Sequence, residues 1–136
     1  MLQSLAAVTI LVPSYEDGLA FFRDILGFAV VEDSPLSPSK RWVVVAPSLN
    51  TGAALVLAVP SDERQRTRVG DQAGGRVGFF LHSDDFWADY ETLRMRGVEF
   101  LETPRSEPYG LVAVFVDPWG GKWDLLQPAS RGLETP

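Results

Sequence analysis

The stretch AVFVDPWGGKWDLLQ, residues 113–127, decides the fold of this chain. Its first residues continue the alternating pattern of a strand that begins at Val112. Residues 117–121, DPWGG, have the composition of a tight turn, because proline presets φ and glycine permits positive φ. The chain then resumes as a second strand, in which Trp123 and Asp124 point to opposite faces. The segment therefore predicts two strands joined by a tight turn.

Asp124 is the unusual residue of this predicted hairpin, because it is an acid between a tryptophan and two leucines. On an inward face its carboxyl group would need a cation, a metal ion or a hydrogen-bond donor as partner. On a solvated face it would need none. Both interpretations stay open from the sequence.

The composition of the chain limits the classes of function that it can have. The chain has 136 residues, of which 46% are hydrophobic, which suits one compact domain. Its net charge of −6 argues against nucleic acid or an anionic membrane as partner. No apolar run approaches the roughly 20 residues that span a bilayer, and residues 6–12 resemble a strand rather than a signal peptide, so we expect a cytoplasmic location. There is no cysteine and only one histidine, His82, so any metal site must be carboxylate-rich or incomplete.

One order of predicted elements occurs twice. Each copy has a strand, a capping serine, a helix that ends at a glycine, and three further strands. A shift of 69 residues lays Val8 on Val77 and Ser14 on Ser83. The repeat predicts an α+β fold of two tandem βαβββ modules that form an eight-stranded, half-open cleft, where function should reside. The boundaries expected within one domain, residues 1–136, are about 5–60 for module 1, 61–74 for a linker, 75–128 for module 2, and 129–136 for a tail.

Several motifs resemble the vicinal oxygen chelate superfamily, which includes glyoxalase I, the extradiol dioxygenases and the bleomycin- and fosfomycin-resistance proteins. They are VPSYEDGLAFFRDILGF at 12–28, GVEF at 97–100, PYG at 108–110 and DPWG at 117–120. The stretch RWVVVAP at 41–47 resembles a glyoxalase-like subgroup of bacterial proteins whose function is mostly unassigned. The resemblance implies the paired modules and a homodimer. It does not select a reaction, because the superfamily hosts both enzymes and binding proteins.

The resemblance also implies where metal ligands would stand, namely on the first and last strand of each module. Those positions fall at Ala7, Val56, Arg76 and Asp124. Only Asp124 can coordinate a metal ion, and Arg76 brings a permanent positive charge. One carboxylate does not hold a divalent ion against water. We therefore expect no metal site and no cofactor of the usual kind, while a divalent metal with further ligands stays open.

Arg76 and Asp124 are expected to pair across the floor of the cleft. The pair would be either a polar anchor for a ligand or a structural filling of the vacated metal site. Aromatic walls suit planar or amphipathic molecules, although aromatic residues at strand spacing also build cores and dimer interfaces. The predicted ligand-binding residues are Arg76, Trp42, Arg41, Phe115, Trp119 and Trp123.

Two functions follow as expectations. The first is a metal-independent protein that binds a small, partly aromatic molecule and sequesters it, for instance in drug or toxin resistance. The second is a glyoxalase- or dioxygenase-like enzyme (a lyase, isomerase or epimerase) with an atypical site around Asp124, assisted by Glu107, Tyr109 or His82. Pairing with Arg76 would lower the pKa of Asp124 and weaken it as a base. His82 is a candidate base or a surface residue at the start of a helix.

Overall fold

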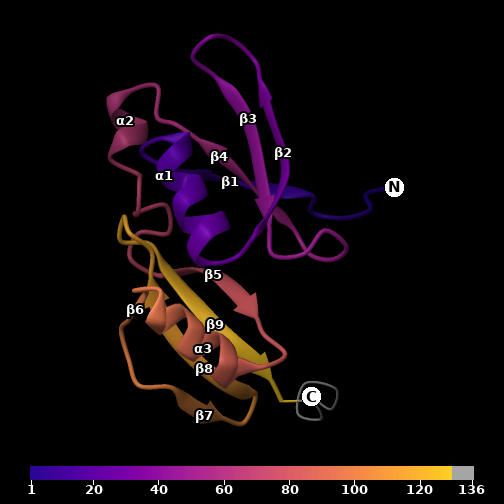
Figure 1. Cartoon of the computed structure of the whole chain (residues 1–136), viewed down its shortest axis with the longest axis vertical. Helices are drawn as coiled ribbons and strands as arrows, with labels where there is room; N and C mark the ends of the chain where they lie inside the picture. Colours follow the sequence, from indigo (N-terminus) through magenta and orange to yellow (C-terminus); the bar gives the residue numbers. More distant parts are fainter. Residues whose placement is uncertain (130–136) are drawn as a thin grey trace. The chain divides into compact units, whose positions relative to one another are not determined.

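The computed structural model describes residues 1–129, so the tail expected at residues 129–136 lies almost wholly outside the described part (Figure 1). The chain divides into two compact units, Met1–Val69 (unit 1) and Gly70–Pro136 (unit 2). The division falls within the stretch expected as a linker. Each unit contains a βαβββ arrangement with its own sheet, which confirms the α+β class and the two modules. No helix of the described residues is long and apolar enough to cross a bilayer.

Unit 1 is a four-stranded sheet in the order β1-β4-β3-β2, with β1 parallel to β4 and the other pairs antiparallel. Its elements are β1 (Ala7–Leu11), α1 (Tyr15–Leu19), the π-helical segment η1 (Ala20–Ile25), β2 (Ala29–Pro35), β3 (Arg41–Ala46), β4 (Ala54–Ala58) and α2 (Glu63–Arg66). The short helix α2 lies within residues 61–74, the stretch expected as a linker. Asp62 begins it by accepting a hydrogen bond from Gln65 N at 2.8 Å.

The first helix begins where the sequence predicts. Ser14 is its N-cap and accepts a hydrogen bond from Asp17 N at 3.0 Å. The helix then widens into η1 and ends at Gly27, whose φ of 78° an L side chain rarely adopts. Gly18 lets the helix lie close to the sheet, because a Cβ there would be 2.8 Å from Cδ1 of Leu57.

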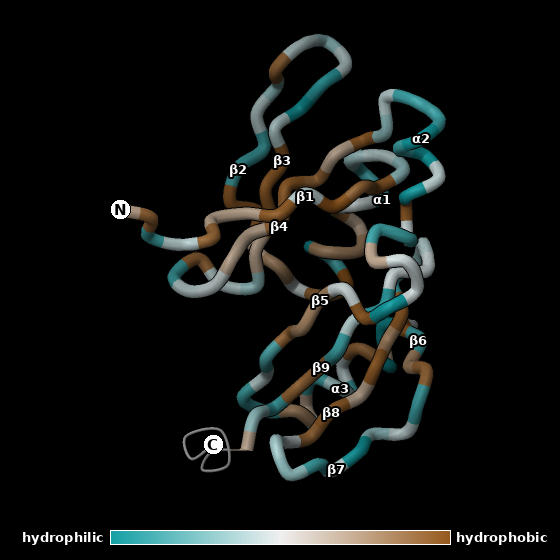
Figure 2. The backbone as a smooth tube through the Cα atoms, turned by 180° about the vertical axis from the view of Figure 1, so that it is seen from behind, coloured by the Kyte–Doolittle hydropathy of each residue, from teal (hydrophilic) through white to brown (hydrophobic). Residues whose placement is uncertain are grey.

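Unit 2 repeats the plan with the order β5-β9-β8-β6, and a further strand, β7, also pairs with β8. Its elements are β5 (Val77–His82), α3 (Phe86–Met95), β6 (Glu99–Phe100), β7 (Arg105–Glu107), β8 (Gly110–Val116) and β9 (Lys122–Pro128). The predicted strand–turn–strand of residues 113–127 forms as β8 and β9. Two short strands, β6 and β7, stand where one was expected, so the described residues form nine strands rather than eight. Figure 2 shows hydrophobic residues concentrated along β8 and β9, and hydrophilic ones along β7.

The start of α3 differs from the prediction. Asp85, not Ser83, is the N-cap. Ser83 supports the cap instead, because its hydroxyl accepts from Asp85 N at 3.0 Å and donates to Asp89 at 2.6 Å. The Gln127 side chain of β9 accepts a hydrogen bond from Phe86 N at 2.7 Å. The last strand of unit 2 thus helps to fix the first turn of its helix.

An aromatic core joins α3 to the unit 2 sheet. Trp123 is 1% exposed, with ring centroids 4.3 Å from Phe79 and 5.9 Å from Phe115. Phe100 lies 5.6 Å from Phe115 and 4.6 Å from Tyr90 of α3. These contacts place Trp123 on the face of the sheet that α3 covers. Side chains alternate along a strand, so Asp124 lies on the opposite face.

Candidate functional site

The side of the unit 2 sheet opposite α3 has Asp124 at its centre, and we call it the Asp124 face. Asp124 pairs with Phe80 of β5 on one side and with Val114 of β8 on the other. Leu126 lies two residues along β9 on the same face. Phe80 is 63% exposed. The strand positions directly beside Asp124 on this face are therefore apolar, while Lys122 lies two residues before it on β9.

The carboxyl group of Asp124 is unusual in its burial and in its hydrogen bonding. Its Oδ1 atom is buried and has no hydrogen-bond partner among the described residues. Burial raises the pKa of Asp124, the negative charge of Glu102 raises it further, and the positive charge of Arg105 opposes the rise. A buried oxygen without a partner costs free energy, which a ligand that pairs with it would recover.

A charged cluster flanks this face, formed by Glu102, Arg105 and Glu107. The Arg105 guanidinium lies 3.1 Å from Oε1 of Glu102 and 2.6 Å from Oε2 of Glu107. The other oxygen of Glu102 accepts a hydrogen bond from Val114 N at 3.0 Å, which ties the cluster to the strand beside Asp124. Hydrogen bonds to Glu102 and Tyr109 raise the pKa of Arg105.

The predicted catalytic residues Glu107 and Tyr109 therefore meet at Arg105 rather than directly at Asp124. The residues that act electrostatically on Asp124 are Glu102 and Arg105, which sequence reasoning missed. The alternating charges of the ETPRSE stretch, residues 102–107, were the available signal.

The expected pair between Arg76 and Asp124 is wrong. Arg76 is exposed and precedes Val77, which pairs with Lys122, whereas Asp124 pairs with Phe80. No ion pair joins Arg76 to Asp124 within residues 1–129. The register of the sheet places Arg76 well before the strand position beside the acid.

The backbone also corrects the register of the internal repeat. Val12 N donates to Ala58 O at 2.9 Å in unit 1, and Ser83 N donates to Leu126 O at 2.8 Å in unit 2. Val12 is thus equivalent to Ser83, a shift of 71 residues rather than 69. A register shift between Val77 and Phe79 interrupts the start of β5.

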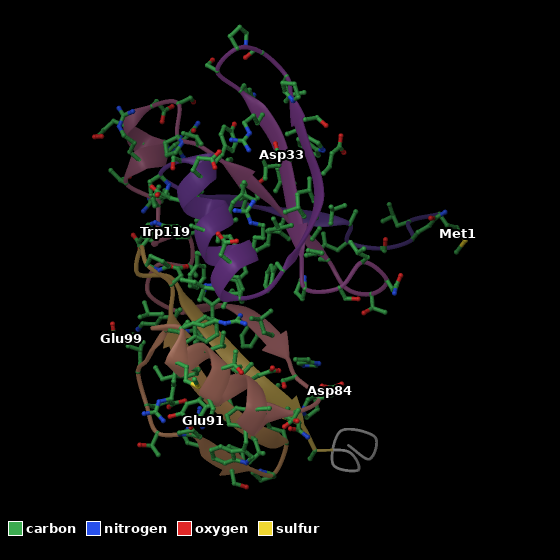
Figure 3. All side chains as sticks on the ribbon, in the orientation of Figure 1. Met1, Asp33, Asp84, Glu91, Glu99 and Trp119 are labelled. Carbon is green, nitrogen blue, oxygen red and sulfur yellow. The ribbon has the colours of Figure 1, made fainter. Side chains whose placement is uncertain are left out.

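Two of the predicted ligand-binding aromatics lie in the core. Phe115 is 0% exposed and stacks with Trp123 on the α3 side. The indole Nε1 of Trp123 donates to buried Asp117 at 3.0 Å. Neither ring reaches the Asp124 face, so the assignment of both as ligand-contacting residues is corrected. Trp119 lies half-buried in the turn that follows β8 (Figure 3).

Arg41 and Trp42 lie in unit 1, at the start of β3. The Arg41 guanidinium pairs with Glu16 and, at 2.6 Å, with Asp33, which is labelled in Figure 3. It also lies 5.2 Å from the ring centroid of Tyr15. Arg41 thus connects the β2–β3 hairpin to α1 and is already neutralised. Trp42 is 40% exposed.

The donor set does not fit the metal site that the resemblance implies. Ala7 and Val56 carry no donor atoms, and Phe80 stands on the strand position beside Asp124. No group of three or more His, Cys, Asp or Glu that could hold a metal ion occurs in the described part of the chain. A single carboxylate leaves most of the coordination shell of a divalent ion to water.

A separate hollow of about 440 Å³ lies beside α3 in unit 2. Its lining residues are Tyr90, Arg94, Val98, Phe100, Leu101, Glu102 and Thr103. Arg94 is engaged there, because its guanidinium lies 5.3 Å from the Tyr90 ring centroid and 3.2 Å from Glu91. Glu102 therefore borders both this hollow and the surroundings of Asp124.

Comparison with known families agrees with the geometry. A model of the Glyoxalase/Bleomycin resistance protein/Dioxygenase superfamily matches residues 4–125. The chain belongs to this superfamily. Its division into paired βαβββ modules is what the sequence motifs predicted.

Relatives of this superfamily member cover nearly the whole chain. An uncharacterized protein of Shewanella frigidimarina (strain NCIMB 400) is 42% identical over 128 residues, which is 93% of this chain and 95% of that protein. The crystal structure of UcmS2 matches with 32% identity and a TM-score of 0.79, covering 93% of this chain and 98% of that one. TnmS3, an antibiotic binding protein from Streptomyces sp. CB03234, matches with 29% identity and a TM-score of 0.77, covering 94% and 98%.

Proposed function

We propose that this superfamily member is a metal-independent binding protein that holds a small, partly aromatic molecule on the Asp124 face. The observation that carries the proposal is the buried Oδ1 of Asp124, which lacks a hydrogen-bond partner within residues 1–129 and lies beside the exposed Phe80. An apolar surface with one polar group to fix orientation is the usual design of a small-molecule site. The likeness to TnmS3, an antibiotic binding protein, supports the same class of function.

Phe80 and Leu126 supply the apolar part of this surface, and Asp124 supplies the polar part. A planar ring would gain from stacking on Phe80, while a polar substituent would satisfy the carboxyl group. Sequestration of such a compound needs no bond to be made or broken. It requires only that the bound form be more stable than the free one.

A second candidate is an enzyme of the lyase, isomerase or epimerase type with Asp124 as the acid–base group. The raised pKa of Asp124 favours it, because a general acid or base works best when its pKa approaches the operating pH. The lack of a pair with Arg76 removes the objection that a paired carboxylate would be too weak a base. Glu107 and Tyr109 would then act through Arg105 rather than on the substrate.

The test combines metal analysis with a binding measurement. Natively purified protein would be analysed by plasma mass spectrometry, and fluorescence anisotropy would follow binding of acridone, a neutral planar fluorophore. We expect no stoichiometric metal and saturable binding that Phe80→Asp abolishes and Asp84→Asn, at an exposed site, leaves unchanged. Stoichiometric Ni, Mn, Fe or Zn that is lost in Asp124→Asn would overturn the metal-free proposal. Turnover of a glyoxalase or dioxygenase substrate would favour the enzyme.

The proposal extends to a homodimer, as the sequence resemblance implies, and to a location in the cytoplasm. Size-exclusion chromatography with light scattering checks the first part. A mass of one chain at micromolar concentration would contradict it, because a specific dimer interface buries enough surface to persist there.

A further inference from the structure

We infer that the Asp124 face selects a cationic aromatic ligand, whose ammonium or amidinium group pairs with the Asp124 carboxylate while its ring lies on Phe80. The inference rests on the proposed function and names the chemical class of its ligand. It comes from the charges around one buried oxygen atom and from the ring beside it.

One oxygen of the Asp124 carboxyl group is a hydrogen-bond acceptor that receives no donor from the described residues. Oδ1 of Asp124 is buried and makes no hydrogen bond to the described residues. The neighbouring strand positions, Phe80 and Val114, offer only apolar side chains. A ligand that brings an N–H donor would satisfy this atom, and a charged donor would do so most strongly.

The charges nearby favour a cation over a neutral donor. Arg105 is the positive group that acts on Asp124, but it is already bound by Glu102 and Glu107. One guanidinium against two carboxylates leaves this cluster with a net negative charge. A cationic ligand would therefore be attracted by the cluster as well as by Asp124. The protein's net charge of −6 adds attraction at longer range.

Phe80 supplies the second half of the recognition. It is 63% exposed and stands on the strand position next to Asp124. A cation over an aromatic face gains from the ring quadrupole, and an aromatic ligand gains from stacking. A compound that carries both features, a planar ring with an amine on it, would use both residues at once.

Binding should also release a proton. Burial and the negative charge of Glu102 raise the pKa of Asp124, so both favour the protonated carboxyl group in the free protein. A cation pairs with the ionised form and would draw the proton off. The other charged or titratable groups facing this part of the sheet are Lys122 on β9, His82 at the end of β5, and Arg105. A proton released on binding is assigned to Asp124 when Asp124→Asn no longer releases it.

The experiment compares two probes of similar shape on three proteins. The probes are 9-aminoacridine, a planar cation at neutral pH, and neutral acridone, each followed by its own fluorescence anisotropy. The proteins are the wild type, Asp124→Asn, and Asp84→Asn, which removes one exposed carboxylate of the same unit (Figure 3). We expect the wild type and Asp84→Asn to bind the cation at least about tenfold more tightly than acridone, and Asp124→Asn to bind the two alike.

The outcomes separate the two proposals. Equal affinity for both probes, or tighter binding of acridone, would overturn the inference and leave the proposed function standing. No binding of either probe would count against both. Calorimetry of the wild type and of Asp124→Asn in buffers with different ionisation enthalpies gives a second readout. Binding of 9-aminoacridine should release more protons from the wild type than from Asp124→Asn as the pH is lowered, and proton uptake by the wild type alone would contradict the inference.

Discussion

Val56 of β4 lies beside Val44 of β3 in unit 1, and at the same point of unit 2 Asp124 lies beside Val114 of β8. The backbone register is the same in both units. The adjacent parallel strand contributes a polar Thr9 next to Val56 in unit 1. The two sheet centres thus differ at two positions, with Thr9 and Val56 in unit 1 where unit 2 has Phe80 and Asp124, while the backbone scaffold stays the same.

The pKa of Asp33 in unit 1 and the pKa of Asp124 in unit 2 are shifted in opposite directions. Asp33 on β2 pairs with Arg41, and that hydrogen-bonded pair holds the pKa of Asp33 below its usual range. Asp124 on β9 has no such partner, and its pKa is raised. In unit 1, Arg41 pairs with Asp33 and Glu16, whereas unit 2 contains one buried carboxyl oxygen, Oδ1 of Asp124, without a partner among the described residues.

The largest expected effect on stability comes from replacing Asp117, a buried acid with a structural role. The equivalent position of unit 1 is Pro47, which cannot play that role. Its carboxylate accepts hydrogen bonds from Trp119 N at 3.0 Å, Gly121 N at 2.8 Å and Trp123 Nε1 at 3.0 Å. Asp117→Ala leaves these donors unsatisfied and should lower the free energy of unfolding by about 3–5 kcal/mol. Urea unfolding followed by tryptophan fluorescence measures it.

The control for this prediction is Asp84→Ala, which removes an exposed acid of the same unit and should change the free energy of unfolding by less than about 0.5 kcal/mol. A loss below about 1 kcal/mol in Asp117→Ala would show that the turn does not depend on its carboxylate.

A second contrast concerns two glycines with positive φ. Gly110 begins β8 with a φ of 145°, and a Cβ there would lie 2.1 Å from Gln127 O. Gly52 in unit 1 has a φ of 81° with nothing near its Cβ position. Gly110→Ala should cost about 2–4 kcal/mol, because the clash is with backbone, and Gly52→Ala about 1 kcal/mol from backbone strain alone. Equal losses in chemical denaturation would mean that φ, and not the clash, decides the cost.

Local signals in the sequence were enough for most of the fold. The turn at residues 117–121 and the cap at Ser14 each depend on a few neighbouring side chains, and both form as predicted. The repeat was found but placed two residues out of register. Alternation cannot detect such an error, because a shift of two residues keeps every strand side chain on the same face. The mistaken pair of Arg76 with Asp124 came from positions implied by the family resemblance, and the repeat in this register agreed with them.

The site was predictable only in part. Asp124 stood out because an acid among apolar residues needs an explanation. Its real electrostatic neighbours, Glu102 and Arg105, come from the connection between β6 and β7, and no periodic pattern fixes where such a loop places its charges. The sequence was consistent both with burial of Trp123 and Phe115 under a helix and with their contact with a ligand. Alternation along a strand defines two faces but does not show which face a helix covers.

Replacing Asp33, the paired acid of unit 1, should have a smaller effect on stability, and that effect should depend on pH. Since the folded-state pKa of Asp33 is lowered, its stabilisation is present above the unfolded-state pKa and is lost as the pH falls through the folded-state value. Asp33→Asn should therefore lose stability at pH 7, and the loss should shrink as the pH is lowered. Its side chain is about a third exposed, so screening limits the loss to under about 1 kcal/mol. A loss that does not change with pH would point to packing instead.

The smallest effect on the free energy of unfolding is expected at Asp124, where a substitution should stabilise the protein rather than destabilise it. Its folded-state pKa is raised, so the folded protein binds more protons than the unfolded chain at weakly acidic pH, and stability falls as the pH rises through that range. Asp124→Val, which copies Val56 of unit 1, removes this cost. Its free energy of unfolding relative to the wild type should increase with pH and level off above the folded-state pKa, at a gain of roughly 0.5 kcal/mol. Urea titrations at pH 4, 5.5 and 7.5 measure the difference. A variant less stable than the wild type at pH 7.5 would mean that the carboxylate has a partner in the folded protein, and that unit 2 holds its acid as unit 1 holds Asp33.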